Sequence, residues 1–321
     1  MRLAVIDVGS NTIHLLVAEC DGRTLDSIVD QSARLRLGAD VARGRAVTSA
    51  KIALAATTVS DYVITAQQQR AQSILLLGTQ AVRAATNGPD LVQSIQQATG
   101  LPLKVLSPAV EARLGCWGTQ LDAPDDQPHL IVDIGGGSTQ LSLAEGSREL
   151  RFLGSLPVGS VSLATQFLLH DPPSRNARER LEPAVHEAVA AVASREVQES
   201  GVGSQESGVA AAEARVAPGY GIIIGGVGRR LRKAGRLSSG EPLVRLWVER
   251  LVDAVMSVSA ETLEVLGAAK AEDVDMIRSG AVILREVMHA YGLQYCLVSN
   301  NGIREGAILA TARGEDVVDG G

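Results

Sequence analysis

The sequence predicts an α/β protein of two related domains that share a cleft. The first reason is an internal repeat: an apolar run that ends in Asp-x-Gly occurs at residues 4–19 and again, without a gap, at 130–145. Strand-like apolar runs also alternate with amphipathic helix-like runs, which is typical of parallel α/β layers. Finally, 321 residues exceed the usual size of one domain, and a hydrophobic share of 45% can supply two cores.

Each copy of the repeat reads as a buried strand, a tight turn and a second strand. Asp7 precedes the turn Gly9-Ser10-Asn11, and Asp133 precedes the turn Gly135-Gly136-Gly137-Ser138. Glycines let backbone N–H groups approach an oxyanion closely, and a nearby carboxylate can hold a hydrated divalent cation against it. Each turn taken singly is as easily an ordinary β-hairpin, but a facing pair predicts a phosphate clamp.

The rest of the first half alternates strands and helices. The apolar run at 73–77 predicts a buried strand, which leads into the junction 78–83, where exposed helix N–H groups can bind an anion. There Arg83 can offer a bidentate guanidinium to phosphate, although it can equally be a surface arginine. The other predicted elements are a strand near Ile28, a helix over 48–70, a helix over 90–99, a strand over 103–106 and a helix that begins at Glu111.

A polar, proline-containing segment at 122–128 precedes the second repeat and marks a domain boundary. We therefore expect an N-terminal domain over 1–124 and a C-terminal domain over 125–321. A tandem Gln-Glu-Ser-Gly-Val repeat predicts a flexible insertion over about 198–217. The second half should otherwise contain a helix-rich region over 160–197, a strand over 220–224 that enters a third glycine turn at 225–228, helices over 243–266 and 271–291, a strand over 295–299, and a closing helix from Gly302 that packs back toward the N-terminal domain.

Composition excludes several classes of partner. Only 2% of residues are aromatic and the net charge is −6, so we expect no nucleic-acid surface. No apolar stretch approaches the roughly 20 residues that cross a bilayer, and the first residues enter a strand rather than a signal sequence. We therefore expect a cytoplasmic protein with no membrane partner. Three scattered cysteines predict core thiols, and five unclustered histidines disfavour a transition-metal site.

Short motifs occur along nearly the whole chain. They are Asp7-Val-Gly-Ser-Asn-Thr12, Gly78-Thr-Gln-Ala-Val-Arg83, Glu111-Ala-Arg-Leu114, Asp133-Ile-Gly-Gly-Gly-Ser-Thr139 and Ile303-Arg-Glu-Gly306. In order and spacing this set resembles the exopolyphosphatase and guanosine pentaphosphate phosphatase family. The resemblance implies two actin-like (ribonuclease H-like) α/β domains, with mixed sheets flanked by helices and substrate phosphates in the cleft between them.

The resemblance also implies a chemistry: a hydrolase that releases terminal phosphate from inorganic polyphosphate or guanosine pentaphosphate. By similarity, Glu111 is the general base, while Arg83 and Asp133 complete the catalytic set. Asp133, with Asp7 opposite, is expected to hold Mg²⁺, with Mn²⁺ as the alternative cation. The alternative roles are purely structural: Glu111 as a helix-capping or surface carboxylate and Asp133 as a turn-forming carboxylate. The expected phosphate-binding positions are Gly9, Ser10, Asn11, Gly135, Gly136, Gly137, Ser138, Gly225 and Gly226.

The chain departs from the family pattern at Gln140, where Glu typically follows Gly-Gly-Gly-Ser-Thr. The amide has nearly the same shape as Glu but carries no charge and accepts no proton usefully, so the reaction centre lacks one acid. Val110 and Val227 likewise stand where relatives carry an acid and a small hydroxyl residue. Turnover is therefore expected to be slow, or the metal requirement altered.

Three functions remain open. The leading one is the Mg²⁺-dependent hydrolase, and low aromatic content favours the inorganic chain over a guanine nucleotide. The alternative, motivated by Gln140, is a catalytically weak or inactive sensor that binds (p)ppGpp or polyphosphate. An actin-like small-molecule kinase fits the Glu111-Ala-Arg and Arg304-Glu-Gly elements less well. A homodimer is the default oligomeric state for a cytosolic enzyme of this size.

Overall fold

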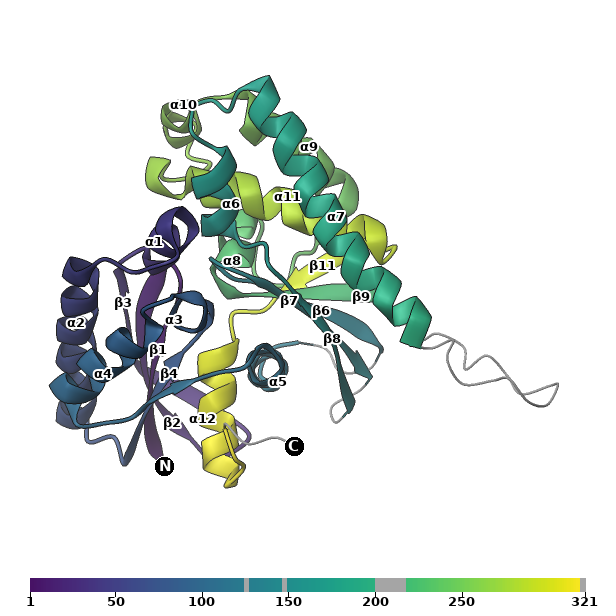
Figure 1. Cartoon of the computed structure of the whole chain (residues 1–321). Coiled ribbons are helices and arrows are strands. Elements are labelled where there is room, and N and C mark those ends of the chain that lie inside the picture. The colour runs from purple at the N-terminus through teal and green to yellow at the C-terminus, as the bar shows by residue number, and fades with distance from the viewer. Residues whose placement is uncertain (124–126, 146–148, 200–217, 318–321) are drawn as a thin grey trace.

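The computed structural model describes residues 1–123, 127–145, 149–199 and 218–317. It contains two β-sheets that lie side by side, each covered by helices (Figure 1). This confirms the predicted α/β class with mixed sheets. The expected boundary at 124/125 and most of the expected insertion at 198–217 lie outside the described residues. In the part of the chain that the structure describes, no helix is long and apolar enough to cross a bilayer.

The first sheet is built around the first repeat. Its elements are β1 Arg2–Val8, β2 Thr12–Cys20, β3 Leu25–Arg34, β4 Ser73–Gly78 and β5 Leu103–Val105, with helices α1 Leu37–Gly44, α2 Ser49–Gln68, α3 Gln80–Ala84 and α4 Gly88–Thr99. The strand order is β3-β2-β1-β4-β5, with antiparallel pairing through β3, β2 and β1 and parallel pairing through β1, β4 and β5. Because side chains alternate along β1, Ala4 and Ile6 pack into the core under α2 and α4, while Leu3 and Val5 pack on the opposite face.

The second sheet repeats this plan around the second repeat. Its elements are β6 His129–Ile134, β7 Thr139–Glu145, β8 Glu149–Leu156, β9 Tyr220–Ile224, β10 Leu243–Val244 and β11 Tyr295–Val298, with helices α6 Ser160–Phe167, α7 Arg175–Glu199, α8 Gly225–Ala234, α9 Arg245–Ser257, α10 Ala260–Val265, the 3₁₀ helix η1 Ala271–Asp273 and α11 Val274–Ala290. The order is β10-β11-β9-β6-β7-β8. As β1 pairs with β2 and β4, so β6 pairs antiparallel with β7 and parallel with β9.

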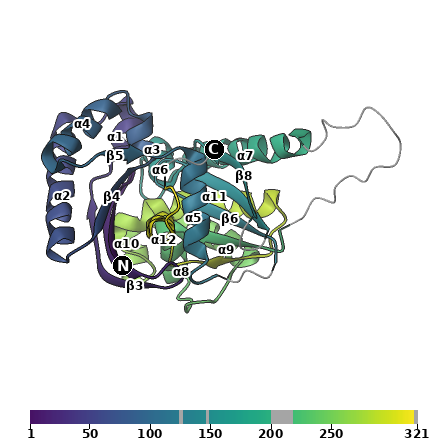
Figure 2. The ribbon, with the colours of Figure 1, turned by 90° about the horizontal axis from the view of Figure 1, so that it is seen from below.

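Two helices, α5 Pro108–Thr119 and α12 Ile303–Arg313, lie between the sheets (Figure 2). Helix α12 packs on β1 and β2 as well as on α5, so the last described helix closes a face of the first sheet. Helix α5 also contacts the second sheet, where Cys116 joins the cluster around Ile222. The two helices meet at glycines: a Cβ on Gly306 would lie 1.8 Å from the Leu114 carbonyl oxygen.

The structure differs from the predicted elements in a few places, each for a local reason. Helix α5 begins at Pro108 rather than Glu111, because the Ser107 hydroxyl accepts a hydrogen bond from the Val110 N–H and caps the helix one turn earlier. The helix predicted over 243–266 is divided into α9 and α10 because Ser259 caps a new start. Helix α8 already begins at Gly225, so the third glycine turn forms its first turn. Helix α1 and strand β8 were not predicted.

Candidate active site

The two glycine turns of the repeat lie face to face. Each is closed by the equivalent hydrogen bond, from the Gly9 N–H to the Thr12 carbonyl at 3.1 Å and from the Gly135 N–H to the Ser138 carbonyl at 2.9 Å. Contact between the turns is close, since a Cβ on Gly136 would lie 3.0 Å from the Ser10 Cβ. The facing arrangement that the repeat predicts is therefore present.

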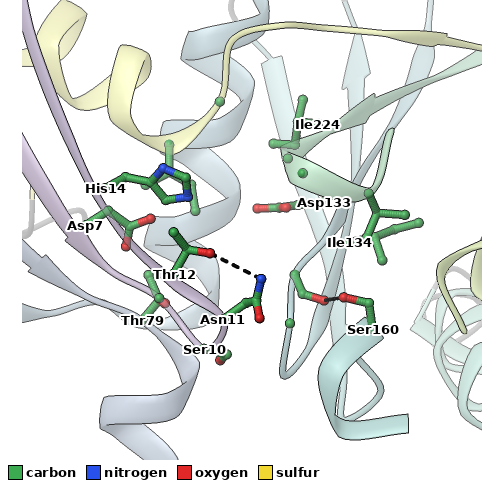
Figure 3. A pocket seen from close by; sticks show the side chains of 18 of the residues that line it. Asp7, Ser10, Asn11, Thr12, His14, Thr79, Asp133, Ile134, Ser160 and Ile224 are labelled. Carbon is green, nitrogen blue, oxygen red and sulfur yellow. Dashed lines mark hydrogen bonds between the residues drawn. The ribbon is translucent and has the colours of Figure 1, made fainter. Parts of the chain in front are cut away.

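A cavity of about 640 Å³ opens beside these turns, between the two sheets. The side chains of Asp7 and Asp133 point toward each other across it (Figure 3). Of the predicted site residues, Arg83 does not line the cavity. Those that do are Asp7, Gly9, Ser10, Asn11, Glu111, Asp133, Gly135, Gly136, Gly137, Ser138, Gly225 and Gly226.

Burial raises the pKa of three of the carboxyl groups that line this cavity, those of Asp7, Glu111 and Asp133. Burial raises the pKa of Asp7 to about 7, against the opposing charge of Arg304. It raises the pKa of Asp133 to about 6, against the opposing charge of Arg229. It raises the pKa of Glu111 to about 7, and the negative charges of Asp133 and Asp7 add to that shift. These three acids therefore stay protonated to a higher pH than a free carboxyl group does.

Glu111 is held at both oxygens. The Arg83 Nη1 donates to Glu111 Oε1 at 2.5 Å and also to the Leu106 carbonyl. On the other side, the Gln140 Nε2 donates to Glu111 Oε2 at 3.3 Å and to the Ser138 hydroxyl at 2.8 Å. Arg83 thus lies behind Glu111 and positions it, rather than reaching into the cavity as a phosphate fork. Gln140, 2% exposed, supplies a donor to the carboxylate.

The chemistry of Asp7 and Asp133 fits a hard divalent cation. The Asp7 Oδ1 is buried without a hydrogen-bond partner among the described residues. Mg²⁺ keeps much of its hydration and needs only one or two carboxylates, so a pair is sufficient. Within the described residues, no group of three or more His, Cys, Asp or Glu side chains is arranged as a metal site. A cation here would consequently retain several waters.

Basic side chains also line the cavity. They come from three elements: Arg34 from β3, Arg229, Arg230 and Lys233 from α8, and Arg304 from α12. The Arg304 guanidinium is fixed by Asp30 at 2.8 Å and lies 3.2 Å from the Glu305 carboxylate. Burial and these arginines lower the pKa of His14 to about 3, so this histidine is neutral at working pH.

Sequence reasoning assigned no role to several of these residues. His14 could have been found, because it pairs with Asp7 in the first hairpin as Gln140 pairs with Asp133 in the second. Arg304 lies in a motif that carried the family resemblance. Arg34 gave no signal, since its place in the cavity depends on contacts with residues more than two hundred positions away.

Known proteins provide an independent comparison. The model of the Ppx/GppA phosphatase family matches residues 16–315. An uncharacterised protein of Streptomyces coelicolor is 34% identical over 202 residues, which cover 61% of this chain and 59% of that protein. Exopolyphosphatase 1 of Mycobacterium leprae is 32% identical over 177 residues, which cover 54% of this chain and 52% of that protein. The chain thus spans little more than half the length of these curated relatives.

Solved structures share the fold over the whole chain. An exopolyphosphatase from Cytophaga hutchinsonii has a TM-score of 0.84 at 20% identity, covering 99% of this chain and 100% of that one. The Aquifex aeolicus PPX-GPPA enzyme has a TM-score of 0.73 at 21% identity, covering 97% and 99%. These likenesses confirm the actin-like pair of domains. With the family match over nearly its full length, the chain belongs to the Ppx/GppA phosphatase family.

Proposed function

We propose that this protein is a phosphoanhydride hydrolase that releases terminal phosphate from inorganic polyphosphate, with guanosine pentaphosphate as a second substrate. The environment of Glu111 is the main support for this proposal. This carboxylate is 3% exposed, lines the cavity beside the facing turns, and has a pKa raised to about 7 by burial. A general base works best when its pKa lies near the working pH. Several relatives are exopolyphosphatases, which agrees with this substrate class.

In the proposed reaction, the two turns hold the terminal phosphoryl group from opposite sides. Their backbone N–H groups and the hydroxyls of Ser10 and Ser138 donate to its oxygens. Glu111 accepts a proton from a water molecule, whose oxygen attacks phosphorus as the bond to the bridging oxygen breaks. The products are inorganic phosphate and a chain shorter by one unit. Arg83 and Gln140 keep both Glu111 oxygens oriented, and each oxygen retains a lone pair for the proton.

Mg²⁺ would be held by Asp7 and Asp133, directly or through water. When bound, it supplies positive charge against the phosphoryl oxygens. The same ion would offset the charge of the buried acids, whose pKa values lie well above their ordinary range in its absence.

The lining of the cavity favours an inorganic chain over a nucleotide. No Phe, Tyr or Trp is among the described residues that line it. A guanine base usually recruits a stacking ring, whereas successive phosphates need cations such as Arg229 and Lys233. We therefore propose polyphosphate as the better substrate.

A phosphate-release assay tests the function directly. Polyphosphates of several lengths and guanosine pentaphosphate would be compared in parallel with Mg²⁺ and with EDTA. We expect Mg²⁺-dependent release that is fastest from polyphosphate. Tight binding of these ligands without release above background would instead support the sensor function that Gln140 motivates.

The Gln140→Glu variant should turn over several-fold faster at saturating Mg²⁺. The added carboxylate would supply a further acid to the reaction centre. The rising limb of its pH–kcat profile should also move upward, because a second negative charge next to Glu111 raises the pKa of that base. Stopped assays between pH 6 and pH 9 would measure both effects. An unchanged rate with an unchanged profile would contradict the role given to this position.

A further inference from the structure

A further carboxylate, that of Asp273, lies among the basic side chains that line the cavity. The Asp273 Oδ1 accepts a hydrogen bond from the Arg34 Nη2 at 2.7 Å and lies 3.1 Å from the Arg230 Nε. The three residues come from η1, β3 and α8, and all of them line the cavity. Asp273 is mostly buried, with a side-chain exposure of 16%. One carboxylate is therefore held between two guanidinium groups, one from β3 of the first sheet and one from α8, which follows β9 of the second sheet.

Glu272 extends this contact. Its Oε2 lies 3.2 Å from the Arg34 Nη1, and its carbonyl oxygen accepts from the Arg36 Nη2 at 3.2 Å. The segment that carries Glu272 and Asp273 thus ties the second sheet and its helices to the end of β3. Glu272 and Arg34 both line the cavity that we assign to substrate, so their contact lies on its wall.

The two arginines are not fully satisfied by these carboxylates. The Arg34 Nη1 and the Arg230 Nε are both buried and make no aligned hydrogen bond to any described residue, although each lies within ion-pair distance of a carboxylate oxygen. The Arg230 Nη1 donates to the Gly226 carbonyl, so that guanidinium is held in place at the third glycine turn. Buried N–H donors normally have partners, and two neighbouring phosphates of one chain, with four non-bridging oxygens between them, would supply more acceptors than a single carboxylate.

We propose that Arg34 and Arg230 form a second oxyanion subsite, for successive phosphates of the substrate distant from the reacting one, and that Asp273 occupies it until a sufficiently long chain displaces the carboxylate. This inference rests on the proposed function. Each internal phosphate has two non-bridging oxygens and one negative charge, as a carboxylate has, so two successive phosphates offer twice the acceptors and twice the charge of Asp273 and can satisfy both guanidinium groups together. Displacement also frees the contact between β3 and η1. A substrate too short to reach Arg34 gains nothing, and Asp273 therefore sets the preferred chain length.

The test compares long-chain polyphosphate with tripolyphosphate on the full chain. In the Asp273→Asn variant, the ratio of KM for long chain to KM for tripolyphosphate should fall by roughly 5- to 10-fold, because the subsite no longer has to be vacated. In Arg34→Gln the same ratio should rise by roughly tenfold, because a charge-assisted partner is lost. Asp253→Asn removes a surface carboxylate that also pairs with an arginine, Arg178, and should leave the ratio unchanged.

A change in stability alone would alter both substrates together, so the ratio isolates the subsite. Equal ratios in the wild type, Asp273→Asn and Arg34→Gln would overturn the proposal. Failure of the proposed function looks different, because the wild type would then release no phosphate from either substrate. In that event, calorimetry can still test the subsite by measuring the binding of the same two polyphosphates to the wild type and both variants. The long chain should bind more tightly to Asp273→Asn and more weakly to Arg34→Gln than to the wild type. Equal affinities would reject the subsite.

Discussion

Replacing Glu111 by Gln should lower kcat for phosphate release by about 10²- to 10⁴-fold, the usual contribution of a general base. Glu111→Ala should do the same or more, because it also leaves Arg83 and Gln140 without their shared partner. The Gln variant keeps the shape of the side chain, so the affinity for polyphosphate should change little. Initial-rate and binding measurements on the same preparations would separate the two quantities.

A matched control is available on α7, where the exposed Glu187 lies outside the cavity. Glu187→Gln should be as active as the wild type. If Glu111→Gln retained wild-type turnover while binding its substrate normally, the assignment of the base would be wrong, and the hydrolase proposal would need another base.

Asp133→Asn should reduce activity by at least about 100-fold and abolish the stabilisation of the protein by Mg²⁺. The sign of the pH dependence follows from the pKa values. Burial raises the pKa of Asp133 and Asp7 from 3.8 to about 6 and about 7, and that of Glu111 from 4.5 to about 7. The folded state therefore binds protons more tightly than the unfolded state. Without metal, the free energy of unfolding should fall as pH rises from about 4 to above 7.

Mg²⁺ competes with these protons. At pH 8 the acids are largely ionised and the ion binds freely, whereas at pH 5.5 it must displace protons from them. We expect Mg²⁺ to raise Tm more at pH 8 than at pH 5.5, by about 2–4 °C for each ~1 kcal/mol of binding free energy. Thermal melts with Mg²⁺ and with EDTA would measure this. Asp61→Asn, on the exposed side of α2, serves as the control, and an equal Mg²⁺ effect in Asp133→Asn would exclude Asp133 as the ligand.

The internal repeat made most of the fold predictable. Both hairpins, their turns and the acids before them follow from one pattern that occurs twice, and the structure brings the turns together as expected. The predicted helix boundaries were wrong where a single capping residue sets the start of the helix, as Ser107 does for α5. Helix α1 was not predicted. The residue that precedes it, Arg36, adopts the left-handed backbone conformation, which is uncommon for an arginine and cannot be expected from the sequence.

The cavity residues that lie on the repeat could be predicted from the sequence. The residues that reach the cavity through contacts between elements far apart in the chain could not. Arg83 was expected to reach phosphate, yet it donates to Glu111, because the direction of a long side chain is decided by its neighbours in space. The contact between Arg34 and Asp273 joins residues 239 positions apart. Neither residue belongs to a motif, so only the tertiary structure brings them into the cavity.

The crossing of α5 and α12 also has a consequence for the order in which the polypeptide becomes stable during synthesis. Residues 303–313 cover apolar side chains of β1 and β2, including Leu3, Val5 and Leu16. These side chains therefore lack this part of their native cover until some three hundred later residues have been synthesised. The lobe that is translated first can mature only after the other, and the nascent chain needs protection from aggregation for most of its synthesis.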